Sequence, residues 1–238
     1  TAYEIRLSLV GSEMCIRDRY CDILGVRSFP KLQNREEDYK DEMLNSFIKY
    51  AKVPVISLES SILHPFQSLA DLITITETWN SNPTAKISKP KVVLTWAPHV
   101  KSLPQAVPNS FSEWMLRSNV EFVITHPKGY ELADKFTKGA SVEYNQDTAF
   151  KGADFIYAKN WSSYTDYGKI ISQDKNWMLT NKKMSLTNNA KFMHCLPVRR
   201  NVVVADEVLD GPNSMVLQQA QNRIYAAQVI LKKILHAL

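Results

Sequence analysis

The sequence has few of the residues that build metal sites, disulfide frameworks and glycine-rich nucleotide loops. Its 238 residues include three cysteines, five histidines and seven glycines. The cysteines are odd in number and lack metal-ligand spacing, and the histidines form neither an HxxxH nor an HExxH pattern. No GxGxxG motif follows any predicted strand. These absences argue against a zinc site and against a dinucleotide-binding Rossmann domain.

Long basic tracts and long apolar runs are also missing. The formal net charge is +5, but 29 Lys and Arg are interleaved with 24 acidic residues and no basic tract exceeds two residues. A diffuse positive field of this kind suits small anionic substrates at least as well as nucleic acid. Without a secretory signal or an apolar run of membrane-spanning length, we expect a cytoplasmic protein that binds neither nucleic acid nor membrane.

Short β-branched or aromatic runs alternate with segments of helical period. Strands are predicted at 21–26, 53–58, 91–96, 121–126, 141–144, 153–159 and 190–195. Helices are predicted at 66–79, 110–117, 130–138, 146–152 and 214–238. Such alternation predicts an α/β fold with parallel strands joined by right-handed crossovers, and it leaves the strand order open.

The polar stretch at residues 81–90 is the best candidate for a domain boundary. We expect one domain over 20–78, a second over 79–213, and an amphipathic helix over 214–238 that docks on the first domain through an apolar stripe including Leu217 and Ile224. Residues 1–19 begin without methionine and show no clear period, so they are expected to be non-native sequence. The chain is therefore expected to be truncated at its N-terminus and inactive by itself.

Polar and cationic side chains follow several predicted strands. In open α/β sheets ligands bind beyond the carboxyl ends of the strands, so these residues are candidates for a site. They are Arg27, Glu59, His64, His99, Lys159, His194, Cys195, Arg199 and Arg200. Glu59 could pair with a substrate amine, although an isolated carboxylate is more often a surface residue.

The HPFQ motif at 64–67 places a histidine and an amide one helical turn apart. Pro65 helps to start the helix, so His64 and Gln67 can face the same ligand. A neutral imidazole can polarise a carbonyl oxygen while the amide fixes the nitrogen beside it. The alternative is a histidine that merely caps a helix.

The HCLPVRRN stretch at 194–201 places two adjacent guanidinium groups on a short loop. Each presents planar donors that fit a carboxylate or a phosphate, whereas the alternative is a solvated basic turn. Cys195 lies between a histidine and these arginines, which could lower its pKa and make it a nucleophile. That role is disfavoured because no second histidine with an orienting carboxylate is evident.

Three stretches together, GVRSF (25–29), HPFQSLADL (64–72) and FMHCLPVRRN (192–201), resemble the transcarbamylase family of aspartate and ornithine carbamoyltransferases. The resemblance extends from about residue 20 to the end. It implies a parallel-sheet transcarbamylase fold with an incomplete carbamoyl-phosphate domain and a complete amino-acid-binding domain. It also implies a homotrimer with shared active sites, and no metal or organic cofactor.

The resemblance divides the candidate residues between two substrates. Those implied for the carbamoyl group and its phosphate are Arg27, His64, Gln67, Cys195, Leu196 and Arg199, with the Leu196 carbonyl on the carbamoyl nitrogen and Cys195 beside the attacking amine. Those implied for an acylated amino acid are Glu59, His99, Lys101, Lys159 and Arg200. The family's Ser-x-Arg-Thr-Arg phosphate cradle does not occur in these 238 residues and is expected upstream.

The acyl group is indicated by two further stretches. AKNWSSY (158–164) stands where ornithine enzymes carry Asp-x-Trp-x-Ser-Met-Gly, and TWAPHVKSLPQAVPNSF (95–111) is similar to the N-acylornithine branch. Val203 stands where N-acetylornithine enzymes carry a lysine. We expect carbamoyl transfer from carbamoyl phosphate to N-succinylornithine in arginine biosynthesis. The alternatives are an N-acetylornithine enzyme and a non-catalytic anion-binding relative.

Overall fold

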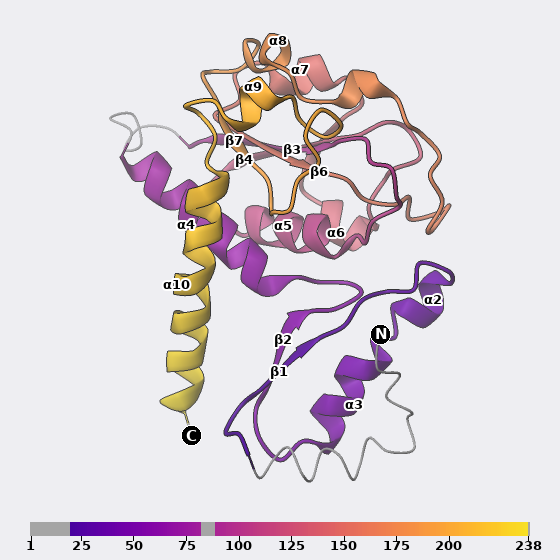
Figure 1. The fold of residues 1–238 in the computed structure, drawn as a ribbon, viewed down its shortest axis with the longest axis vertical. Helices are drawn as coiled ribbons and strands as arrows, with labels where there is room; N and C mark the ends of the chain where they lie inside the picture. The colour runs from indigo at the N-terminus through magenta and orange to yellow at the C-terminus, as the bar shows by residue number, and fades with distance from the viewer. Residues whose placement is uncertain (1–19, 82–88, 238) are drawn as a thin grey trace.

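The computed structural model describes residues 20–81 and 89–237, and there the expected α/β fold is confirmed (Figure 1). The first part of the chain forms a two-stranded parallel sheet with helices beside it. Its elements are β1 (Leu24–Arg27), α2 (Arg35–Asp38), α3 (Glu42–Tyr50), β2 (Val55–Glu59) and α4 (Pro65–Asn80). Residues 1–19, which were expected to be non-native sequence, lie outside the described part of the chain. So does most of the polar stretch 81–90, which was expected to be a domain boundary.

The second part contains five parallel strands in the order β5-β4-β3-β6-β7. The strands are β3 (Lys91–Trp96), β4 (Glu121–Thr125), β5 (Ser141–Glu143), β6 (Phe155–Lys159) and β7 (Lys191–Met193). The chain starts in the middle at β3, builds outward to β5, and then returns to the other side of β3 with β6. The order therefore reverses between β3 and β6, where open sheets of this type bind their ligands.

Helices cover both faces of this sheet (Figure 1). Those on one face are α5 (Ala106–Leu116) and α6 (Asp134–Thr137), and those on the other are α7 (Gln146–Phe150), α8 (Asn181–Met184) and α9 (Asp206–Leu209). Adjacent strand residues point to opposite faces, so Val92 packs in a cluster with Phe111 of α5, whereas Val93 packs in a cluster with Phe150 of α7. Burial on both faces explains why the strands read as continuous apolar runs.

The last helix, α10 (Val216–Leu235), packs along α4 and joins the two parts of the fold (Figure 1). Its docking was predicted, but the face that docks was not. The predicted stripe residues Leu217 and Ile224 are 77% and 51% exposed, while Gln219, Asn222 and Ala226 are buried. Two amides with partners on α4 replace the expected apolar contact. None of the helices in the described residues is long and apolar enough to cross a membrane.

Several predicted element boundaries were wrong for identifiable reasons. α5 begins at Ala106 and not at Ser110, because Pro108 lies in its first turn, where the missing N–H has no intrahelical acceptor. The helix predicted at 130–138 shrinks to α6, because Tyr130 and Leu132 are buried before it in irregular backbone. Four short or polar helices, α2, α3, α8 and α9, were not predicted.

We expect Ala226→Leu to destabilise the fold by about 1–3 kcal/mol, because Ala226 is fully buried on the docked face of α10 and extra methyl groups there would force α10 away from α4. Urea unfolding monitored by circular dichroism would measure the effect. Gln221→Leu, which introduces the same side chain at an exposed position of α10, should change stability by less than about 0.5 kcal/mol. Equal effects of the two changes would contradict the packing described.

Candidate active site

A cavity of about 480 Å³ lies beyond the carboxyl ends of β2, β3, β6 and β7. It is therefore next to the point at which the strand order reverses, where Trp96 of β3 pairs with Lys159 of β6. Nine of the eleven predicted site residues line it: Arg27, Glu59, His64, Gln67, His99, Lys159, Cys195, Leu196 and Arg199. Lys101 and Arg200 are not among its lining residues.

Arg27 and Glu59 form an ion pair at the ends of β1 and β2. The guanidinium Nε and Nη2 lie 2.9 and 2.7 Å from Glu59 Oε2, and the arginine also lies over the Phe29 ring. The Arg27 side chain is 53% exposed whereas that of Glu59 is 8% exposed. Sequence reasoning expected Glu59 to face an amine of the substrate, but here its nearest charged partner is Arg27.

His64 is an electrically neutral member of the site. Its Nε2 lies 3.5 Å from Glu59 Oε2, and the side chain is almost completely buried. Burial lowers the pKa of His64 to about 4, and the positive charges of Arg223, Arg27 and Lys159 act in the same direction. At neutral pH the imidazole therefore carries one N–H donor and no charge.

The HPFQ motif begins α4 as expected. Pro65 occupies the first helical position, which needs no N–H acceptor, and the His64 N–H donates to Ser110 Oγ at 2.7 Å. Gln67, one turn into the helix, is 1% exposed and lines the cavity. Its amide Nε2 donates to Asp71 Oδ1 at 2.7 Å, which leaves the amide oxygen for a ligand.

His99 and Arg199 meet across the mouth of the cavity. Arg199 Nε donates to His99 Nε2 at 3.1 Å, and since a guanidinium cannot accept, the His99 proton is on Nδ1. That nitrogen lies 3.0 Å from the Lys101 carbonyl oxygen and 3.1 Å from the Lys101 backbone nitrogen; with the proton on Nδ1, the carbonyl oxygen accepts and the backbone N–H is not bonded to the ring. Burial lowers the pKa of His99, and Lys159 and Arg199 contribute to the same shift. The neutral imidazole thus orients Arg199.

Lys159 is the most buried cation in the cavity wall, with 9% of its surface exposed at the end of β6. No carboxylate in residues 20–81 and 89–237 forms a salt bridge with it. A buried ammonium group without a counter-ion is costly, so this position favours an anionic ligand. The loop after Lys159 is fixed by Asn160 Nδ2, which donates to the Ala97 carbonyl at 2.7 Å, and by Gln105, which donates to the Ser162 carbonyl.

Cys195 and Leu196 follow β7, and the Leu196–Pro197 peptide bond is cis. Burial raises the pKa of the Cys195 thiol, although the positive charge of Lys159 opposes this shift. The thiol is therefore protonated at neutral pH. A protonated thiol is a weak nucleophile, so the direction of this shift argues against the nucleophile alternative, and the positioning role of Cys195 stays a prediction.

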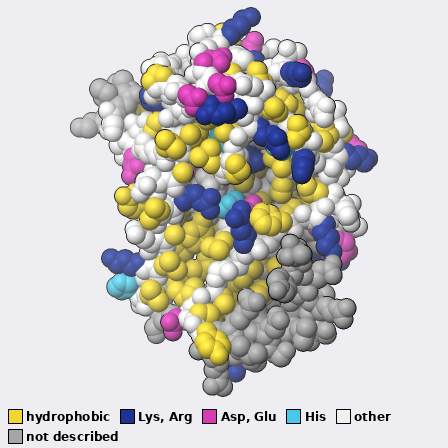
Figure 2. Space-filling model, in the orientation of Figure 1, with side chains coloured by type: hydrophobic (Ala, Val, Ile, Leu, Met, Phe, Trp, Pro, Cys, Tyr) yellow, Lys and Arg dark blue, Asp and Glu magenta, His cyan; other side chains and the backbone are white. Residues whose placement is uncertain are grey.

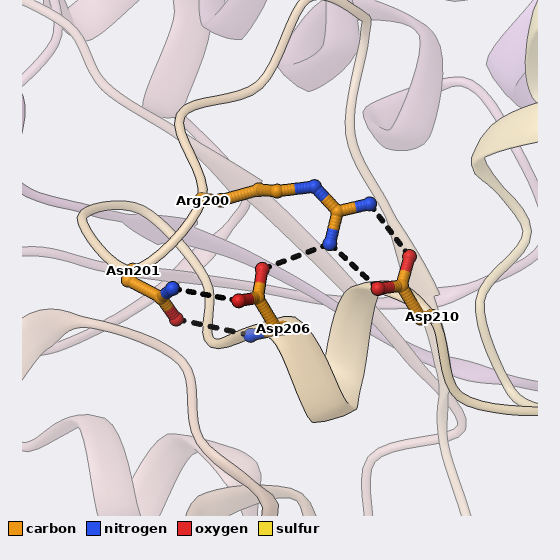
Figure 3. Close-up of polar contacts among 4 residues, drawn as sticks. All are labelled: Arg200, Asn201, Asp206 and Asp210. Atoms are coloured by element: carbon orange, nitrogen blue, oxygen red, sulfur yellow. Dashed lines mark hydrogen bonds and ion pairs between the residues drawn. The ribbon is translucent and has the colours of Figure 1, made fainter.

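Arg200 is not among the lining residues of the cavity and is held by two carboxylates (Figure 3). Its Nη1 lies 2.8 Å from Asp206 Oδ1 and 2.6 Å from Asp210 Oδ2, and its Nη2 lies 2.7 Å from Asp210 Oδ1. The guanidinium lowers the pKa of both carboxyl groups. The geometry therefore gives no support to the predicted contact of Arg200 with a substrate. Lys101 lies in the exposed loop beside His99, outside the lining.

Arg223 of α10 lines the cavity and was missed by sequence reasoning. The signal that could have revealed it is the i, i+3, i+4 spacing of Gln219, Asn222 and Arg223, which places three polar side chains on one side of the helix. With Arg223, four cations and one carboxylate line the cavity: Arg27, Lys159, Arg199, Arg223 and Glu59. Figure 2 shows Lys and Arg side chains gathered near the middle of this face, above a broad apolar area.

Comparison with known proteins identifies the family. The model of the aspartate/ornithine carbamoyltransferase Asp/Orn binding domain matches residues 104–234, and that of the carbamoyl-P binding domain matches residues 13–77. The chain belongs to the aspartate/ornithine carbamoyltransferase family. In this carbamoyltransferase, residues of both matched segments line the cationic cavity, for example His64 from the first and Arg199 from the second.

Relatives with curated names include two kinds of N-acylornithine enzyme. An N-succinylornithine carbamoyltransferase of Bacteroides fragilis (strain 638R) is 56% identical over 221 residues, which cover 92% of this carbamoyltransferase chain and 68% of the relative. An N-acetylornithine carbamoyltransferase of Xanthomonas campestris pv. campestris is 36% identical over 231 residues, which cover 90% of this chain and 67% of the relative. The chain thus spans about two thirds of the length of both.

Solved structures of N-acetyl-L-ornithine transcarbamylase have the same fold. One superposes with a TM-score of 0.87 at 34% identity, covering 94% of this chain and 73% of the other. A point mutant of that enzyme, complexed with carbamyl phosphate and N-succinyl-L-norvaline, has a TM-score of 0.87 at 33% identity and covers 94% of this chain and 72% of the other. The predicted parallel-sheet transcarbamylase fold is therefore confirmed.

Buried neutral histidine makes the carbamoyltransferase chain sensitive to acid. Burial lowers the pKa of His194 to about 3, so below about pH 6.5 the unfolded chain binds a proton there that the folded chain does not. Stability should therefore fall as the pH decreases from about 6.5 to about 4. We expect the free energy of unfolding of His194→Asn to decrease by about 2 kcal/mol less than that of the wild type over this pH range. Urea unfolding at pH 7 and pH 4.5 would measure it.

His236→Asn is the matched control, because His236 is exposed at the end of α10. This change should leave the pH dependence of unfolding as in the wild type. If the wild type and His194→Asn lost the same free energy of unfolding between pH 7 and pH 4.5, the burial of a neutral His194 would be contradicted.

Proposed function

We propose that this protein transfers the carbamoyl group of carbamoyl phosphate to the δ-amine of N-succinylornithine, giving N-succinylcitrulline and phosphate in arginine biosynthesis. The observation that carries the proposal is the cavity at the reversal point of the sheet, whose lining residues in the described chain include four cations and one carboxylate. Both substrates are anions, so a cationic cavity suits them. The 56% identity to an N-succinylornithine carbamoyltransferase supports the choice of acceptor.

Carbamoyl phosphate fits the side of the cavity formed by Arg27, His64, Gln67 and Arg199. Arginine forks suit phosphate oxygens, and the neutral imidazole of His64 can donate its N–H to the carbamoyl oxygen. The free oxygen of Gln67 and the carbonyl oxygen of Leu196 are acceptors for the carbamoyl NH₂. This assignment gives each polar atom of the substrate a partner of opposite hydrogen-bonding character.

The reaction requires stabilisation of negative charge at two places. As the δ-amine attacks the carbonyl carbon, charge develops first on the carbonyl oxygen and then on the departing phosphate. Fixed donors such as Arg27, His64 and Arg199 stabilise both charges more strongly than they stabilise the neutral carbonyl group, which lowers the barrier. Cys195, protonated at neutral pH, lies beside the amine as a positioning group.

The acylated amino acid fits the side formed by Glu59, His99 and Lys159. Lys159 is a buried cation without a carboxylate partner in the described chain, so it suits a carboxylate of the amino acid. Lys101 lies two residues after His99 in an exposed loop, and we assign it to the outer carboxylate of the succinyl group. We propose these contacts as the origin of the acyl preference.

The domain limits and the assembly are also proposals. We propose that residues 20–78 belong to the carbamoyl-phosphate domain, that 79–213 form the amino-acid domain, and that 214–238 pack back on the first, as the contact of α10 with α4 supports. We further propose a cytoplasmic homotrimer with active sites shared between subunits, which rests on membership of the family.

N-acetylornithine is the second candidate acceptor, supported by relatives at 36% identity and by the fold of the N-acetylornithine enzyme. Val203 is buried in the apolar core, so this chain has no amine at the position where the N-acetylornithine enzymes carry a lysine. A non-catalytic relative would bind carbamoyl phosphate without forming a ureido product.

We expect the protein with its complete sequence to carbamoylate N-succinylornithine with a kcat/KM at least about tenfold above that for N-acetylornithine or ornithine, because an added carboxylate can pair with a lysine. A colorimetric assay of the ureido product with the three amines would measure this. Lys159→Met should reduce the rate with all three. A preference for free ornithine would refute the assignment of the acceptor, and binding without turnover would indicate the non-catalytic relative.

We expect Arg199→Ala to lower kcat by about 10²-fold or more, because one donor to the developing negative charge is lost. Arg200→Ala is the matched control: the neighbouring guanidinium is bound to Asp206 and Asp210 outside the cavity, so kcat should stay within about threefold of the wild type. Steady-state kinetics with both variants would separate the two roles. Similar losses would show that the loop conformation, and not the Arg199 charge, supports catalysis.

A further inference from the structure

A buried carboxylate lies directly behind the cavity wall without lining it. Asp71 of α4 is 0% exposed, and its Oδ1 accepts two hydrogen bonds, from Gln67 Nε2 at 2.7 Å and from Gln219 Nε2 at 2.6 Å. A buried carboxyl group is costly without partners, and here two amides of different helices supply them. Asp71 therefore joins two side chains that are far apart in the sequence.

The first of these bonds fixes which end of the Gln67 amide faces the cavity. Because the NH₂ group is engaged by Asp71, the Gln67 oxygen is the end that remains for a ligand. An amide turned the other way would present donors, which repel the NH₂ of a carbamoyl group and attract its oxygen. The orientation of Gln67 thus determines which edge of a planar ligand binds beside it.

The second bond reaches the opposite wall. Gln219 gives its NH₂ to Asp71, and its oxygen accepts the backbone N–H of His194 at 3.0 Å. His194 begins the loop that carries Cys195, Leu196 and Arg199 into the cavity. The hydrogen-bond chain Gln67–Asp71–Gln219–His194 therefore spans from α4 through α10 to the end of β7.

We propose that Asp71 is a positioning residue that holds the Gln67 oxygen and the 194–199 loop in a fixed relation, so that both can accept hydrogen bonds from the carbamoyl NH₂. The identity of this ligand rests on the proposed function, whereas the hydrogen-bond chain does not. Asp71 acts in either protonation state, because Oδ1 accepts both bonds whether or not the other oxygen carries a proton.

A neighbouring pair shows what a purely structural contact between the same helices looks like. One turn along α4, Thr74 Oγ1 accepts from Asn222 Nδ2 at 3.0 Å and donates to the Ala70 carbonyl. Thr74 and Asn222 are buried as deeply as Asp71 and Gln219, but they bond to each other, to Ala70 and to Glu77, none of which lines the cavity, whereas Asp71 bonds to the lining residue Gln67. Loss of the Thr74 pair should weaken the helix contact without altering the ligand site.

The test compares Asp71→Leu, Asp71→Asn and Thr74→Val in the protein with its complete sequence. Asp71→Leu removes both bonds, so the KM for carbamoyl phosphate should rise about tenfold or more, and the His194 amide should exchange with deuterium at least about tenfold faster. Asp71→Asn keeps an Oδ1 acceptor and should restore both values to within about threefold of the wild type. Thr74→Val should lower the melting temperature but leave KM and His194 exchange unchanged.

The proposal is overturned if Thr74→Val shifts KM and His194 exchange as much as Asp71→Leu does, or if Asp71→Leu shifts neither. Should Asp71→Leu fail to fold, Asp71→Ser serves in its place, because its short hydroxyl cannot reach both amides. A wild-type protein without turnover would count against the proposed function only. His194 exchange would then still decide whether Asp71 holds the loop.

Discussion

The parallel direction of the strands is the constraint on which the site depends. Parallel pairing places the carboxyl ends of β3 and β6 next to each other, with Trp96 opposite Lys159, and the strand order reverses there, as it does at the ligand sites of open sheets. The loop after β7 lines the cavity at this point, as do β2 and the start of α4. Lys159 and Cys195, at the strand ends of the five-stranded sheet, thus share one cavity with Glu59 of the two-stranded sheet and Arg223 of α10.

Local sequence carried much of the information about this arrangement. Strands buried on both faces read as apolar runs, so β3, β4 and β6 could be predicted close to their observed limits. Short motifs also predicted their own geometry, since Pro65 starts α4 and sets Gln67 one turn after His64. Nine predicted residues lie around one cavity for this reason, although their roles remain proposals.

Features that depend on distant partners could not be predicted in the same way. Asp71 and Gln219 are 148 positions apart, and neither residue type signals the other. Arg199 and Arg200 are chemically identical neighbours, but the backbone directs one to His99 and the other to Asp206 and Asp210. The apolar stripe of α10 misled the prediction of its docked face because α4 offers a buried carboxylate and a hydroxyl there, which select amides instead.

The ion pair between Arg27 and Glu59 places a negative charge beside a guanidinium in the wall of the cavity. Glu59 is an internal counter-ion that an incoming anion must outcompete for the same guanidinium. A monovalent ion of the solvent offers Arg27 no more than Glu59 already does, whereas a multiply charged oxyanion offers several oxygens at once. The Glu59 carboxylate should therefore make Arg27 favour multiply charged oxyanions over monovalent ones.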